Sequence, residues 1–127
     1  MAHILIVDDS PTEVMLLSEI VRRGGHRVST ASSAVEGITL AREEHPDLIL
    51  MDVVMPEMNG FQATRSLSRD PQTAEIPVII VTSKTMETDR AWGMRQGARD
   101  FVVKPVRERD LLERIGSLLP GGGGAAA

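Results

Sequence analysis

Three short stretches of the chain are apolar at every position, and helical spacing of apolar residues follows each of them. The continuous runs are Ile4–Val7, Leu48–Met51 and Val78–Val81. Because helices cover both faces of a doubly wound parallel sheet, its inner strands are aliphatic throughout, so these runs are predicted to be central strands. The runs Arg27–Ala31 and Phe101–Val103 are mixed or short, and we expect them at the edges.

A helix is predicted after each strand. The first has Ser10 as its N-cap, Pro11 at its first position and Glu13 placed to complete a capping box, and Gly24 ends it. The other four are expected from Ser33, up to about Arg69, over Met86–Gln96 and over Arg107–Leu119. Five strand–helix repeats predict an α/β fold, a doubly wound five-stranded parallel sheet with five helices on its two faces. The flavodoxin-like strand order 2-1-3-4-5 fits three central and two edge strands.

The length of 127 residues fits one domain, with a core large enough to be stable without disulfides or a structural metal. We expect residues 1–119 to form this domain. The Gly/Ala tail 120–127 is expected to be a flexible end or an expression remnant. That division leaves no length for an attached output domain, so any output is expected on the surface of the domain itself.

Composition removes several classes of function. The absence of cysteine excludes a disulfide framework, a thiol nucleophile and a Cys-ligated zinc. A net charge of −4 and the scarcity of aromatic residues argue against nucleic acid as a partner. The apolar runs are too short to insert into a membrane and the start lacks the basic region of a signal peptide, so a cytoplasmic protein is expected.

Polar residues stand at the carboxyl ends of four predicted strands. Asp8 and Asp9 follow the first, Asp52 the third, Thr82 the fourth and Lys104 the fifth. Since the carboxyl ends of parallel strands share one edge of the sheet, these residues are predicted to meet in one site. Three clustered carboxylates need a compensating charge, which a hard divalent cation such as Mg²⁺ supplies through oxygen ligands.

This set of groups points to phosphoryl transfer. A carboxylate can accept a phosphoryl group, while a cation, a lysine and a hydroxyl stabilise the charge that develops. Asp52 is the predicted nucleophile because it stands alone on a central strand, which leaves the Asp8–Asp9 pair to hold metal. Each group alone has an ordinary explanation as a cap or turn residue; the prediction depends on their conjunction.

Four segments together resemble the receiver domain of two-component response regulators, which is CheY-like in fold. The resemblance covers about residues 1–119, and the segments that carry it are 7–10 (VDDS), 51–60 (MDVVMPEMNG), 81–83 (VTS) and 101–105 (FVVKP).

The resemblance implies a role for each site residue. A histidine kinase would phosphorylate Asp52, and Mg²⁺, or Mn²⁺ in its place, would be held by Asp9, Asp52 and the backbone carbonyl of Val54. Asp8 would contact the ion through a water molecule. Lys104 would pair with the phosphoryl group, and the bond from Lys104 to Pro105 would be cis. The protein would not be an enzyme beyond its own phosphorylation and dephosphorylation.

A switch is implied as well. Thr82 would move toward the phosphoryl oxygens and Phe101 would turn inward behind it, changing the partner affinity of the fourth helix, fifth strand and fifth helix. Two positions depart from the common pattern. Ser83 stands where alanine is frequent, and Phe101 where tyrosine is common, so position 101 has no hydroxyl for the switch.

The stretch 90–100, with 10–13 and 60–65, resembles stand-alone regulators of type IV pilus twitching motility. That similarity implies a CheA-like histidine kinase with Hpt domains as phosphodonor and an effector such as a pilus motor component. A phosphate sink for a shared kinase, without an effector, is the alternative. A flavin or nucleotide enzyme on this fold is disfavoured because no glycine-rich phosphate loop occurs. Within 90–100, Trp92 is left open between packing its helix and an interface role.

Overall fold

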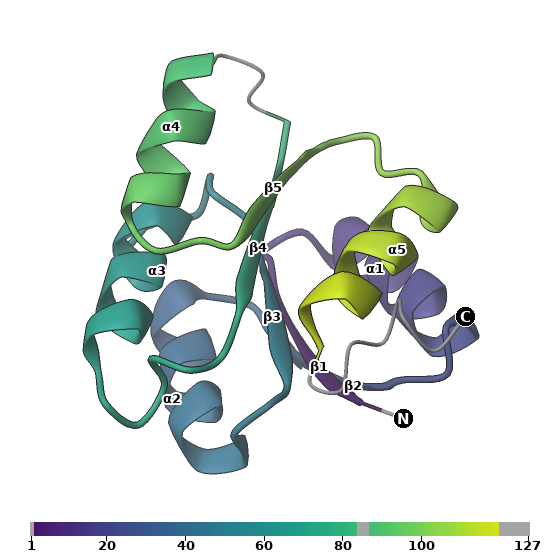
Figure 1. Ribbon diagram of the computed structural model, residues 1–127, viewed down its shortest axis with the longest axis horizontal. Helices are drawn as coiled ribbons and strands as arrows, with labels where there is room; N and C mark the ends of the chain where they lie inside the picture. Colours follow the sequence, from purple (N-terminus) through teal and green to yellow (C-terminus); the bar gives the residue numbers. More distant parts are fainter. Residues whose placement is uncertain (1, 84–86, 120–127) are drawn as a thin grey trace.

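Five parallel strands alternate with five helices in the computed structural model, which describes residues 2–83 and 87–119 (Figure 1). The strands are β1 (His3–Val7), β2 (Arg27–Ala31), β3 (Leu48–Met51), β4 (Val78–Thr82) and β5 (Asp100–Val103). The helices are α1 (Pro11–Arg23), α2 (Ala34–Glu44), α3 (Gly60–Arg69), α4 (Glu87–Arg95) and α5 (Glu108–Leu118). Element bounds differ from the predicted ones by a residue at several ends. The tail 120–127 and Met86 lie outside the described residues.

The strand order is β2-β1-β3-β4-β5, and all four pairings are parallel. The prediction of three central aliphatic strands and two edge strands is therefore confirmed. In β3, every residue is buried, whereas β2 keeps an exposed residue at its first position. The difference follows from position, because an edge strand is covered on fewer sides than a central one.

Alternate residues of each strand point into two separate packing layers. Ile4 and Ile6 of β1 pack with α1 and α5, whereas Leu5 and Val7 pack with α2 and α3. A smaller cluster around Phe101 joins α3, β4 and β5 below α4. Figure 1 shows the result: α1 and α5 cover one face of the sheet, and α2, α3 and α4 cover the other.

The helix caps differ from one prediction. Ser10 does cap α1, since its hydroxyl accepts the Glu13 N–H at 3.4 Å. The predicted return bond from Glu13 is wrong: the Ser10 N–H donates to the Asp8 carboxylate at 2.9 Å instead. A complete capping box forms at α3, where the backbone N–H of Asn59 and of Gln62 each donate to the other's side chain at 2.9 Å.

Candidate functional site

Three aspartates meet at the carboxyl edge of the sheet, as predicted. Asp8 follows β1 and Asp52 follows β3, and the backbone fixes both, because Asp8 N–H donates to Ala31 and Asp52 N–H donates to Val7. One carboxylate oxygen of each of Asp8, Asp9 and Asp52 lies within 4.8 Å of the others. Asp8 is 2 % exposed and Asp52 is 7 % exposed, whereas Asp9 lies open to solvent. The site is thus an acidic cluster with one accessible member.

The ammonium group of Lys104 lies within this cluster. Its Nζ is 3.0 Å from Asp8 Oδ2, 3.4 Å from Asp52 Oδ1 and 3.1 Å from Glu13 Oε1. Sequence reasoning missed Glu13 as a member of the site, because a capping role already accounted for it. The signal that could have found it is its place in the first turn of α1, three residues beyond a loop whose aspartates were already assigned to the site.

The charges of the cluster shift the ionisation of two members. Burial raises the pKa of Asp52, and the charge of Asp8 raises it further, while Lys104 opposes both. Burial by itself would lower the pKa of Lys104, but the hydrogen bond to Asp8 and the charges of Asp52 and Asp8 outweigh it, and the pKa is raised. Lys104 therefore stays protonated and offsets part of the carboxylate repulsion.

The donor set suits a small hard cation. Asp8, Asp9 and Asp52 offer carboxylate oxygens in one place, and oxygen ligands with room for water are what Mg²⁺ prefers. With Glu13 included, four carboxylates face one lysine, which leaves net negative charge for a divalent ion to neutralise. Val54, whose carbonyl is the remaining predicted ligand, stands in the loop two residues after Asp52 and is 59 % exposed.

The loop after β3 is held close to the site by Gly60. Its N–H donates to the carbonyl of Val53 at 3.0 Å, and a β-carbon at this position would collide with the backbone carbonyl of Asp52. Only glycine permits that close approach. The first residue of α3 is thus packed directly against the backbone of the predicted nucleophile.

The remaining predicted residues lie on β4 and β5. Thr82 is fully buried, and its carbonyl accepts the Lys104 N–H at 2.7 Å, which joins the two strand ends. The bond between Lys104 and Pro105 is cis, the isomer that the resemblance implied.

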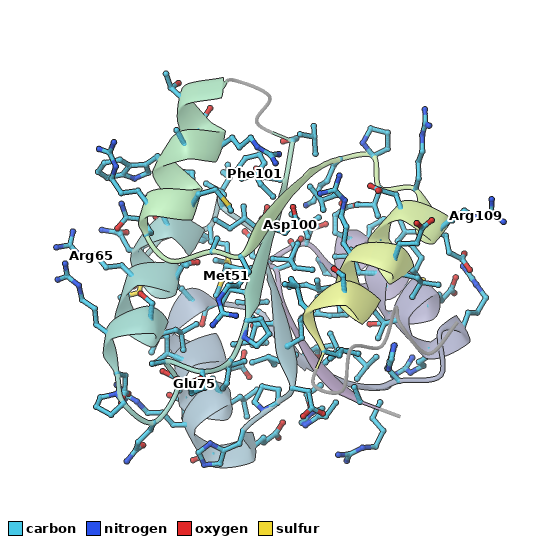
Figure 2. The ribbon with its side chains drawn as sticks, viewed as in Figure 1. Met51, Arg65, Glu75, Asp100, Phe101 and Arg109 are labelled. Atoms are coloured by element: carbon cyan, nitrogen blue, oxygen red, sulfur yellow. The ribbon has the colours of Figure 1, made fainter. Side chains whose placement is uncertain are left out.

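Phe101 lies away from the acidic cluster, in the core below α4. It is 3 % exposed, so its ring already points inward in this structure (Figure 2). The guanidinium of Arg90 lies 6.0 Å from the ring centroid, and Arg90 Nη1 donates to the Phe101 carbonyl at 3.3 Å. The inward turn predicted for the switch is therefore an arrangement that this structure already has.

The response regulator receiver domain model matches residues 4–116 of the chain. The chain belongs to the response regulator receiver family. Protein PilH of Pseudomonas aeruginosa is 56 % identical over 121 residues, which span 95 % of this chain and all of PilH. Response regulator PleD of Caulobacter vibrioides is 40 % identical over 117 residues, which make up 92 % of this chain and 26 % of PleD. The solved structure of the chemotaxis protein CheY4 of Vibrio cholerae superposes with a TM-score of 0.87 at 30 % identity, over 94 % of this chain and 99 % of CheY4.

Membership of this family places the chain in a two-component system. A receiver domain implies a kinase that phosphorylates it and a downstream effector, and its acidic pocket binds Mg²⁺. The cluster of Asp8, Asp9 and Asp52 fits a phosphoacceptor site of this kind. Among the helices of the described ranges, none is both long and apolar enough to cross a bilayer.

Proposed function

We propose that this chain is a cytoplasmic response regulator of type IV pilus twitching motility, with Asp52 as its phosphoacceptor. The observation that carries the assignment is the position of Asp52, nearly buried between two further aspartates and Lys104. Asp8 and Asp9 are adjacent in sequence on one strand end, whereas Asp52 comes from the neighbouring central strand. The 56 % identity to PilH supports the place in twitching motility.

In the proposed reaction, a carboxylate oxygen of Asp52 attacks the phosphorus of a phosphohistidine. The new P–O bond forms as the P–N bond breaks, and the electron pair returns to the imidazole nitrogen of the donor, so that Asp52 carries an acyl phosphate. Lys104 is already 3.4 Å from Asp52 and would pair with the added phosphoryl oxygens. Water reverses the modification by hydrolysis. The chain is then a phosphoacceptor with self-catalysed steps rather than an enzyme with a separate substrate.

Asp9, Asp52 and the Val54 carbonyl are the proposed ligands of Mg²⁺, with Mn²⁺ as an alternative ion and Asp8 acting through water. The ion supplies neutralisation of the charge on the transferred group. Asp9 is suited to a direct ligand because it is the exposed member of the cluster. Asp8 is suited to an indirect role because its two oxygens already bind Lys104 Nζ and the Ser10 N–H.

The proposed output surface is formed by α4, β5 and α5. A phosphoryl group on Asp52 would attract the Thr82 hydroxyl and the Lys104 ammonium group. Thr82 is the last residue of β4, and Lys104 begins the segment between β5 and α5. Phe101 of β5 packs against α4: its ring lies so close to Gly93 of α4 that a β-carbon added there would be 3.4 Å from it. A change at the strand ends can therefore reach α4 through packing, without a hydroxyl at position 101.

Phosphorylation with acetyl phosphate and Mg²⁺, followed by intact-protein mass spectrometry, tests the acceptor. We expect the wild-type chain and Asp89→Asn to gain one phosphoryl mass, and Asp52→Asn to gain none. Labelling of Asp52→Asn at the wild-type level would exclude Asp52 as the acceptor. Transfer from a CheA-like kinase with Hpt domains then tests the donor.

The effector role has its own test. Phosphorylated chain should bind a pilus motor component more tightly than unphosphorylated chain in a pull-down with purified components. Rapid loss of the phosphoryl group together with equal binding of both forms would favour a phosphate sink for a shared kinase instead.

A further inference from the structure

The outer side of the α3–α4 layer carries an aromatic side chain and three arginines that play no part in the proposed phosphorylation. Trp92 is 48 % exposed, although tryptophan usually contributes to a core. Arg65, Arg69 and Arg95 are exposed as well. These four residues are called the α3–α4 patch below. At this exposure about half of the Trp92 surface is open to a partner, so an interface role is available to it besides packing.

The register of α4 places Trp92 on the flank next to α3. Gly93 faces the core, where a β-carbon would meet Ile80 and Phe61. Gln96, one turn after Trp92 on the same stripe, is buried, and its carbonyl accepts a hydrogen bond from Ser68 of α3 at 2.9 Å.

The other flank of α4 belongs to the proposed output surface. Arg90, which lies on the opposite side of Gly93 from Trp92, donates to the Phe101 carbonyl of β5. The indole of Trp92 is therefore on a different surface from the α4–β5–α5 output surface, and α4 separates the two.

The arginines of the patch come from both helices. Arg65 and Arg69 are one turn apart on α3, on the same outer stripe, and Figure 2 shows Arg65 pointing away from the fold. Arg95 lies one turn after Trp92 on α4. Within residues 2–83 and 87–119, none of these three guanidinium groups has an ion-pair partner. The acidic residue next to Arg69, Asp70, is bound by Arg42 of α2 at 2.7 Å.

We propose that the α3–α4 patch is a second docking surface, which binds an acidic segment of a partner protein that carries an apolar residue to cover Trp92. Three arginines without an ion-pair partner among the described residues, against one acidic residue a turn before Trp92 (Asp89), leave positive charge on this side of a chain whose net charge is −4. Such a local field steers an acidic partner to this side of the molecule. Tryptophan and arginine are also the residues that contribute most often to binding energy at protein interfaces.

A protein segment fits this surface better than a polyanion does. Nucleic acid binding needs a basic surface long enough to follow several phosphates, and the rest of this chain is net acidic. An exposed indole on the same helix layer as three exposed guanidinium groups offers both an apolar anchor and charge complementarity, which together suit a mixed acidic and apolar segment.

The chain carries its own reporter, because Trp92 is the one tryptophan in its sequence and tyrosine is absent. Intrinsic fluorescence is therefore a direct measure of the environment of the patch. The probe is a short synthetic peptide rich in Glu and Asp with a single Leu, titrated into the unphosphorylated chain at low salt. We expect the emission to move to shorter wavelength in a saturable way, and high salt to weaken the binding.

Charge reversal gives the matched comparison. The double variant Arg65→Glu with Arg95→Glu should bind the peptide about tenfold more weakly or worse. Arg109→Glu, an exposed arginine of α5 on the opposite side of the molecule in Figure 2, should bind as the wild type does. Equal urea midpoints for all variants will show that the fold is kept. The measurement uses no phosphorylation, so it stands apart from the assignment of Asp52.

Several results would overturn the proposal. Emission that does not respond to millimolar peptide would remove the docking surface, and so would equal affinities for the double variant and the wild type. Tighter binding of a single-stranded oligonucleotide, of phosphatidylglycerol vesicles or of a lysine-rich version of the peptide would show that the proposed partner chemistry is wrong.

Discussion

Replacement of Lys104 by methionine removes the ammonium group that lies 3.0 Å from Asp8 and 3.4 Å from Asp52. The apolar stem of the side chain is kept in approximate length, so the charge is the main change. Two nearly buried carboxylates are then left side by side without this counter-charge. We expect the free energy of unfolding at neutral pH to fall in the absence of divalent cations.

The magnitude follows from these distances. At an effective dielectric constant of about 20, a pair of unit charges about 3 Å apart attracts by roughly 5 kcal/mol before desolvation is counted. Removing one partner of a buried pair costs about 3–5 kcal/mol, because the other charge stays buried. The Lys104 side chain is 15 % exposed, which screens part of the interaction, and we expect a loss of about 3 kcal/mol. A domain of this size has a stability of about 5–15 kcal/mol, so the variant should still fold.

The assay is urea unfolding followed by circular dichroism, in EDTA and then with Mg²⁺. The matched control is Arg23→Met, which breaks an ion pair of 2.7 Å between two exposed side chains and should change stability far less. Mg²⁺ at about one hundred times its Kd stabilises a binding protein by about 2.7 kcal/mol, and the gain should be larger for Lys104→Met than for the wild type. A loss below about 1 kcal/mol in EDTA would refute the account of the buried cluster.

Three other changes test the fold and its ionisation. Gly60→Ala should destabilise the chain and slow acetyl-phosphate labelling, because the new β-carbon collides with the Asp52 carbonyl; wild-type values for both would contradict this. Leu111→Ala, in the fully buried face of α5, should lower stability by about 2–5 kcal/mol in urea unfolding, while Leu16→Ala, half exposed on α1, should cost little. Burial lowers the pKa of His26, whose Nδ1 accepts a backbone N–H at 3.2 Å, so the unfolded chain binds the proton more readily. Stability should therefore fall as the pH drops below the unfolded value of about 6.5, and His26→Gln should flatten that slope; an unchanged slope would refute it.

The site was predictable from sequence to an unusual degree because its residues stand at strand ends. In a parallel sheet, position along the chain fixes position in space at that edge, so Asp8, Asp52 and Lys104 could be placed together before any distance was known. Glu13 was not predictable in the same way. The spacing of residues in α1 indicates only a local partner for its carboxylate, the Ser10 N–H. In the structure that N–H donates to Asp8 and the carboxylate pairs with the distant Lys104.

The state of the aromatic at 101 was also outside the reach of sequence. Its inward position depends on the space that Gly93 leaves and on Arg90 lying over its ring, and both belong to a helix of a different segment. The same holds for Trp92. Helical spacing shows which face of a helix a residue lies on, but which face is buried depends on where the neighbouring helix packs.

The sequence by itself determined the order of elements, the central and edge strands and the edge at which the acidic residues gather. These follow from backbone geometry and from the burial of aliphatic runs, which depend on local pattern and connectivity. Tertiary structure decided which partner each charged side chain takes: Glu13 binds Lys104, Asp70 binds Arg42, and Arg65 and Arg95 are left without one within the described ranges. The physical reason is that ion pairing depends on distances of a few ångströms between segments far apart in the chain, and only the packed fold sets those distances.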